Sequence, residues 1–211
     1  MNFEKLRTSR INQWIIIHLR YVVGFAFFPS GLVKLMGERF TRISTDDPIG
    51  YFFEALYQSG FYWNFLGLAQ LIAGILLMTQ RFATLGALMF LAILSNIWII
   101  TISLSFTGTW IITSLMMIAV LLLVVWDNHK WLPLFNYNKA STVKEYPDPA
   151  SVWIIAGVIY AVSFMILYML DPVKGNVYEK WLTGILIITI LVTFVFSNLK
   201  AYRNHKLMLN T

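Results

Sequence analysis

Six long apolar segments separated by polar stretches dominate the pattern of hydrophobic and polar positions along this chain. Each segment is long enough for a helix to cross a bilayer hydrocarbon core of about 30 Å. We expect transmembrane helices over residues 15–36, 61–79, 82–106, 110–126, 152–170 and 181–199. The pattern therefore predicts an all-α integral membrane protein with six spans.

The polar stretches indicate how the chain is divided. We predict a four-span core within residues 1–126, of which residues 1–10 are a polar tail. A polar connection over residues 127–151 follows, and its three prolines argue against one continuous helix. Residues 152–211 then form a two-span extension with a basic tail.

The polar stretch between the first two spans contains its own helix signal. Asp47 followed by Pro48 is typical of a helix start, with an N-cap and proline at the first helical position. Apolar residues follow at helical spacing. We therefore expect an amphipathic helix near residues 48–59, lying on the membrane surface.

Composition supports the membrane assignment and excludes several kinds of chemistry. Charged residues make up 12% of the chain and the mean hydropathy is +0.69, whereas a soluble domain has about 25% charged residues. The absence of cysteine excludes disulfides, thiol redox chemistry, iron–sulfur clusters and thiolate metal sites. The net charge of +6 comes mostly from segment ends, which indicates membrane-flanking charge and not nucleic-acid binding.

The basic residues also predict an orientation. An even number of spans places both termini on the same side of the membrane. Ten Lys and Arg residues lie in the tails and loops of that side, whereas the opposite loops contain four: Arg39, Arg42, Lys174 and Lys180. Because positive charge collects on the cytoplasmic side, we expect both termini in the cytoplasm.

The first span carries its polar residues on one narrow face. At 100° per residue, Arg20, Gly24, Phe27, Gly31 and Lys34 fall within about 80° of one another. Arg20 and Lys34 either extend to the nearer membrane surface or form part of an internal polar site. The two glycines let a helix or a flat ligand approach the backbone closely, and plain helix packing is the role we favour for them.

Two further spans place amide side chains within the membrane. Gln70 shares a face of the second span with Gly74, and its amide needs a hydrogen-bond partner, for which Arg20 or a backbone carbonyl of the first span is the candidate. Asn96 lies within the third span, where we favour a hydrogen bond to another helix.

The spans lack the groups that several enzyme and transporter mechanisms need. No Asp or Glu lies within the six spans, which argues against proton-coupled transport. His18 is the only histidine in a span, so a bis-histidine haem is not expected. No nucleophile–base pair can be assembled and no catalytic residue or metal ligand is assigned.

Three runs of residues resemble the DoxX family, small bacterial membrane proteins with a four-helix core. Its first helix is similar to Arg20-x3-Gly24-x6-Gly31-x2-Lys34-Leu35. Its second helix, turn and third helix are similar to Gly67-x2-Gln70-x3-Gly74-Ile75-Leu76-Leu77 and Arg81-Phe82-Ala83-x2-Gly86-Ala87. The resemblance covers about residues 15–126. Many members have glutamate where Gln70 stands, so proton chemistry at that position is not expected here.

The resemblance implies a bacterial inner membrane protein associated with quinone-linked redox partners, and it supplies no catalytic residue. Three functions stay open. The first is an accessory subunit that binds a quinone or lipid and leaves the redox centre to a partner protein. Its candidate binding residues are Arg20, Gly24, Gly31, Lys34, Gln70, Gly74 and Asn96. The second is a scaffold or assembly factor, and the third a small-solute transporter. We expect no independent catalysis, and a quinone is the candidate cofactor.

Overall fold

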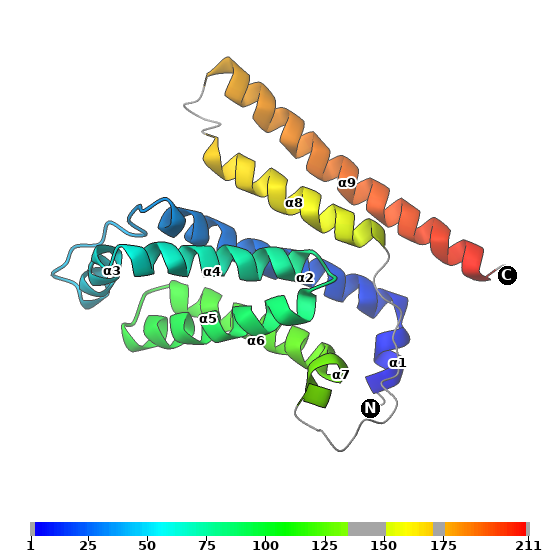
Figure 1. The fold of residues 1–211 in the computed structure, drawn as a ribbon, viewed down its shortest axis with the longest axis horizontal. Coiled ribbons are helices and arrows are strands. Elements are labelled where there is room, and N and C mark those ends of the chain that lie inside the picture. Colours follow the sequence, from blue (N-terminus) through cyan, green and yellow to red (C-terminus); the bar gives the residue numbers. More distant parts are fainter. Residues whose placement is uncertain (1–2, 135–150, 171–175, 210–211) are drawn as a thin grey trace.

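A computed structural model describes residues 3–134, 151–170 and 176–209, and all regular structure in these residues is helical (Figure 1). The helices are α1 (Phe3–Thr8), α2 (Arg10–Leu35), α3 (Pro48–Gln58), α4 (Phe61–Met78), α5 (Ala83–Ser103), α6 (Thr109–Trp126), α7 (Asn128–Trp131), a short 3-10 turn η1 (Leu132–Leu134), α8 (Ser151–Met169) and α9 (Val177–Leu209). Within the described residues, six helices are long and apolar enough to cross a membrane. The predicted six-span, all-α membrane class is therefore confirmed.

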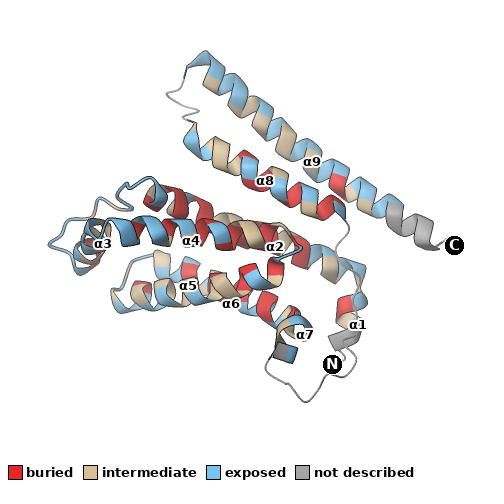
Figure 2. Cartoon of the chain, in the orientation of Figure 1, coloured by how far each residue is buried: buried red, intermediate tan, exposed pale blue. Residues whose placement is uncertain are grey.

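Helices α2 and α4 form the centre of the molecule. Figure 1 shows them side by side, with α5 and α6 on one side and the α8–α9 hairpin on the other. Helix α8 packs on both α2 and α4, whereas α9 packs mainly on α8. Buried residues concentrate on α2 and α4, and α9 is largely exposed (Figure 2). Because the exposed side chains of the outer helices are mostly apolar, these helices present a lipid-compatible surface.

Glycines bring the two central helices into close contact. A Cβ atom on Gly24 would lie 2.8 Å from the carbonyl oxygen of Gly74, and one on Gly31 would lie 3.1 Å from that of Gly67. Only residues without a side chain fit at such crossings. The glycines predicted to mediate helix packing therefore do so.

The residues predicted to form a polar N-terminal tail are largely helical. They contain α1 and the first residue of α2, so the helix that holds the first predicted span begins at Arg10, before residue 15. Asn12 donates a hydrogen bond to the carbonyl of Leu6 at 3.0 Å, and Gln13 donates to that of Arg7 at 2.8 Å. These two bonds hold α1 against α2 and satisfy backbone groups that the helix end would otherwise leave free.

The last helix is also longer than predicted. Helix α9 runs from Val177 to Leu209, beyond both ends of the expected span 181–199. Hydropathy locates the part that fits a bilayer, but helical hydrogen bonding continues into the polar flanks. Of the predicted polar connection, residues 128–134 form α7 and η1, and residues 135–150 lie outside the described part of the chain.

Candidate functional site

The face of α2 that the periodicity singles out is buried along its whole length. Arg20 and Lys34 are each 5% exposed, although they are cations within a membrane-spanning helix. The side chain of Arg20 is held in a buried ion pair with Asp127. The two ends of this face have different surroundings, and we describe them separately.

At one end, Arg20 joins three elements. Its Nη2 donates to both carboxylate oxygens of Asp127 at 2.9 and 2.7 Å, and its Nη1 donates to Oε1 of Gln80 at 3.1 Å. The hydroxyl of Thr84 donates to the same carboxylate at 3.2 Å. We call Arg20, Gln80, Thr84 and Asp127 the Arg20 cluster. It connects α2 to the α4–α5 turn, to the first turn of α5 and to the end of α6.

Gln80 occupies an unusual backbone conformation within the Arg20 cluster. Its φ is +60°, in the left-handed region that non-glycine residues rarely adopt. Its side-chain amide donates to the carbonyls of Ile17 at 3.3 Å and Met78 at 3.4 Å while its oxygen accepts from Arg20. These hydrogen bonds offset the backbone strain and fix the tight turn against α2.

Helix α1 covers the same end of the bundle. Nη2 of Arg7 donates to the carbonyl of Trp126 at 2.6 Å and to Oδ1 of Asn128 at 2.7 Å. Both acceptors flank Asp127. Nearby, burial and the charge of Arg7 lower the pKa of His129 in α7. The cytoplasm-facing end, as the charge pattern predicts it, is therefore closed by paired polar groups.

The glycines of the predicted site contact protein and not open space. A Cβ on Gly74 would lie 2.6 Å from the carbonyl oxygen of Gly24, so the two helices fill the space at this crossing. At Gly31, Leu71 and the backbone of Gly67 occupy the equivalent positions. The structure thus places these glycines at helix contacts, on the same face as the two cations.

Gln70 and Asn96 do not make the contacts that the sequence predicts. Gln70 is 1% exposed, but its Oε1 has no hydrogen-bond partner among the described residues, and Arg20 bonds to Asp127 and Gln80 instead. Asn96 is exposed on α5 and donates to the carbonyl of Ala92 in its own helix at 2.9 Å. The predictions of a hydrogen bond from Arg20 to Gln70 and of an interhelical hydrogen bond from Asn96 are therefore wrong. The alternative partner of Gln70, a backbone carbonyl of the first span, stays a prediction.

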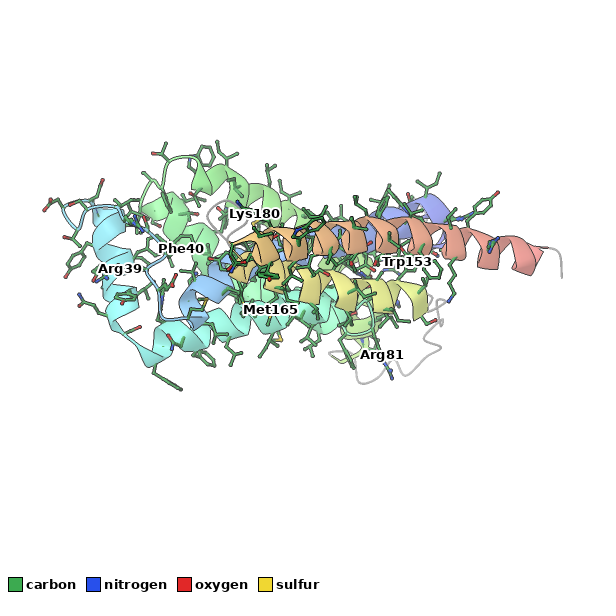
Figure 3. The ribbon with its side chains drawn as sticks, turned by 90° about the horizontal axis from the view of Figure 1, so that it is seen from above. Arg39, Phe40, Arg81, Trp153, Met165 and Lys180 are labelled. Atoms are coloured by element: carbon green, nitrogen blue, oxygen red, sulfur yellow. The ribbon has the colours of Figure 1, made fainter. Side chains whose placement is uncertain are left out.

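At the other end of the face, Lys34 lies between two aromatic rings. Its Nζ is 4.5 Å from the ring centre of Phe40 and 5.1 Å from that of Trp63, and it donates to the carbonyl of Ser30 at 3.0 Å. Trp63 is fixed in turn by a 2.9 Å hydrogen bond to the carbonyl of Glu38. We call Lys34, Phe40 and Trp63 the Lys34 site. Figure 3 shows Phe40 and Arg39 at the α3 end of the molecule, away from Arg81 and Trp153.

The chemistry of the Lys34 site is that of an oxygen-binding position. An ammonium has three N–H donors, and one of them is directed at Ser30. The two rings attract the cation through their faces and exclude water, but they accept no ordinary hydrogen bond. The site can therefore hold a carbonyl, phosphate or carboxylate oxygen against Nζ.

The sequence analysis missed Asp127 and Gln80, the two partners of Arg20. Both lie outside the predicted spans, because Gln80 falls between the second and third spans and Asp127 follows the last residue of the fourth. One signal was available. A lone arginine inside a span needs a counter-charge, and Asp127 directly follows Trp126 at the end of a span on the same predicted side.

Comparison with known proteins relates part of this chain to a family. Residues 15–103, which contain α5 and α4 and nearly all of α2, match the DoxX family model. These residues therefore form a DoxX-like segment of the chain. The chain is 27% identical over 129 residues to the uncharacterized protein YwoB of Bacillus subtilis strain 168, an alignment that covers 56% of the chain and 79% of YwoB. No solved structure matches the chain.

Both ends of the buried α2 face fall within the family match. Arg20, Lys34, Gln70 and Gln80 lie inside residues 15–103, whereas Asp127 and the α8–α9 hairpin lie beyond them. The predicted resemblance is thus confirmed, and the counter-charge of Arg20 comes from outside the matched segment. Among the described residues, no three His, Asp or Glu side chains are grouped so that they could hold a metal ion.

Proposed function

We propose that this protein is an accessory subunit of a membrane redox system that binds the oxygen-bearing head of a quinone or lipid, while a partner protein supplies the redox centre. The observation that carries this proposal is the Lys34 ammonium, buried at the end of a membrane-spanning helix between two aromatic rings. Flat head groups pack against aromatic rings, and a ligand oxygen can accept a hydrogen bond from the ammonium.

The neighbourhood of Lys34 offers a second polar contact. A Cβ on Gly67 would lie 2.7 Å from Cβ of Lys34, so the two helices touch at this level. Gln70 lies three residues further on α4, on the face of Gly67, and carries a buried acceptor without a partner. A head group with a hydroxyl, such as that of a quinol, could donate to this oxygen.

The redox partner and the membrane location rest on the resemblance to the DoxX family and on charge. The DoxX resemblance implies association with quinone-linked partners in the bacterial inner membrane. The excess of Lys and Arg on one side supports both termini in the cytoplasm. In that orientation the Lys34 site faces the outer side of the membrane, opposite to the Arg20 cluster.

Extraction of bound small molecules tests the proposal. Wild-type protein and the variants Lys34→Met and Arg42→Gln are purified in mild detergent, and extracted quinones and lipids are quantified by mass spectrometry. We expect one species near one molecule per chain in the wild type and in Arg42→Gln, whose exposed cation lies in the same loop as Phe40. Loss from folded Lys34→Met supports the site, and equal retention in all three proteins contradicts it.

A scaffold or assembly factor is the second candidate. It is favoured by the Arg20 cluster and by the glycine contacts, because these residues are engaged in joining helices. A wild-type protein that retains no stoichiometric ligand but co-purifies with a membrane partner supports this function. The transporter hypothesis has less support, since it needs Arg20 along a solute path and Arg20 is paired with Asp127.

A further inference from the structure

We infer that the ligand of the Lys34 site is an anion, the phosphate of an acidic phospholipid such as phosphatidylglycerol. This inference rests on the proposed function, because it names the class of head group that Lys34 holds. The argument depends on charge balance at the site, on the position of the site along α2 and on the side from which it can be reached.

Lys34 is a buried cation without a counter-charge in the described part of the chain. The ion pairs found there are Arg20–Asp127 and Arg39–Glu54, and neither includes Lys34. A charge removed from water is costly unless an opposite charge compensates it. One carbonyl oxygen and two ring faces compensate in part, since they are dipoles and quadrupoles and not ions.

The acidic side chains nearest along the chain form no ion pair with Lys34. Glu54 of α3 accepts two hydrogen bonds from Arg39, at 2.8 and 3.0 Å. Glu38 follows the end of α2, and it meets Trp63 through its backbone carbonyl while the residue itself is exposed. A neutral quinone would leave the charge of Lys34 uncompensated, whereas a phosphate would neutralise it.

The position of Lys34 matches the depth of a lipid phosphate. Lys34 lies in the last turn of α2, and the helix ends at Leu35, so the ammonium is near the level where a bilayer changes from hydrocarbon to head groups. Of its two rings, Trp63 is 1% exposed and Phe40 is 38% exposed. A ligand therefore reaches Nζ past Phe40, from the surface on which lipids lie.

Native mass spectrometry of the detergent-solubilised full chain tests this inference. The probes are phosphatidylglycerol, phosphatidylcholine, inorganic phosphate and a short-chain quinone. The proteins are wild type, Lys34→Met, Lys34→Gln and Arg42→Gln, each checked for folding by size-exclusion chromatography. Lys34→Gln keeps two N–H donors but removes the charge, so it separates binding of an anion from binding of a neutral carbonyl.

We expect one phosphatidylglycerol per chain, bound roughly tenfold or more weakly by both Lys34 variants and unchanged in Arg42→Gln, because a hydrogen bond to a charged group is lost. Lys34-dependent binding of the quinone without phosphatidylglycerol overturns the inference and leaves the proposed function standing. Lys34-independent binding of every probe overturns both. Displacement of the lipid by an equal concentration of inorganic phosphate would make the ligand a soluble anion. If both Lys34 variants misfold, competition between phosphatidylglycerol and the quinone for the wild-type protein decides which of the two the Lys34 site binds.

Discussion

Arg20 and Asp127 form a buried ion pair although 107 residues separate them in the chain. Their side chains are 6% and 3% exposed, and one guanidinium nitrogen contacts both carboxylate oxygens. The pair closes the four-helix part of the molecule by connecting its first span to the end of its fourth. It also explains how an arginine can lie inside a membrane-spanning helix without contacting lipid.

Removal of the carboxylate should destabilise the fold strongly. Asp127→Ala leaves the Arg20 guanidinium buried without a counter-charge, which costs about 3–5 kcal/mol of unfolding free energy. The double variant Arg20→Met/Asp127→Leu removes both charges and should recover most of that loss. Thermal unfolding in detergent measures both effects. If the double variant is as unstable as Asp127→Ala, the ion pair stabilises the fold by more than the mutual neutralisation of its two charges.

Two substitutions of Gln80 separate the effect of backbone strain in the turn on stability from the effect of the side-chain hydrogen bonds. Gln80→Ala removes the acceptor of Arg20 and keeps the backbone strain that the wild type also has, so the lost hydrogen bonds alone destabilise the protein, by about 1–3 kcal/mol. Gln80→Gly loses the same hydrogen bonds but adopts the positive φ without strain. We expect Gln80→Gly to unfold at a higher temperature than Gln80→Ala, and the reverse order would mean that the turn carries no strain.

The glycine contacts between α2 and α4 predict a sharp contrast between two alanine substitutions. Gly74→Ala places a Cβ 2.6 Å from the carbonyl of Gly24 and should cost about 1–3 kcal/mol through overpacking. Gly184→Ala is the matched control on α9, where a Cβ meets nothing within 4 Å. Because alanine has a higher helix propensity than glycine, Gly184→Ala should leave the free energy of unfolding equal or slightly higher. Similar losses in both variants would argue against tight α2–α4 packing.

The α7 histidine should make stability depend on pH. Burial, followed by the charge of Arg7, lowers the pKa of His129 below its ordinary value of 6.5. The unfolded chain then binds a proton more readily than the folded one, so stability is fully present above about pH 6.5 and falls as the pH drops through the folded pKa. Thermal midpoints between pH 5 and 8 should decrease less in His129→Gln than in the wild type. If the thermal midpoints of the two proteins decrease in parallel, His129 is not the source of the pH dependence.

The positions of the spans could be predicted from the sequence because hydropathy is a one-dimensional property. Helical periodicity also identified the buried face of α2, since the 100° rotation per residue fixes which side chains share a face. The polar partners could not be found in this way. Asp127 meets Arg20 only through the packing of α2 against α6, which no local pattern records.

Asn96 shows a second limit of sequence reasoning in a membrane. Helix α5 is apolar on nearly every side, so its sequence does not distinguish the face toward other helices from the face toward lipid. Asn96 lies on the outward face and satisfies its donor within its own helix. A polar residue in a span therefore predicts a hydrogen bond but not the helix that supplies the acceptor.

The distance along the chain between Arg20 and Asp127 also matters during biosynthesis. Arg20 leaves the ribosome 107 residues before its partner, which at 5–20 residues per second corresponds to a delay of roughly 5–20 s. Throughout this delay the first span contains a cation whose permanent counter-charge has not yet been made. Burial of Arg20 is costly until the carboxylate of Asp127 is available, because a charge removed from water needs a compensating charge.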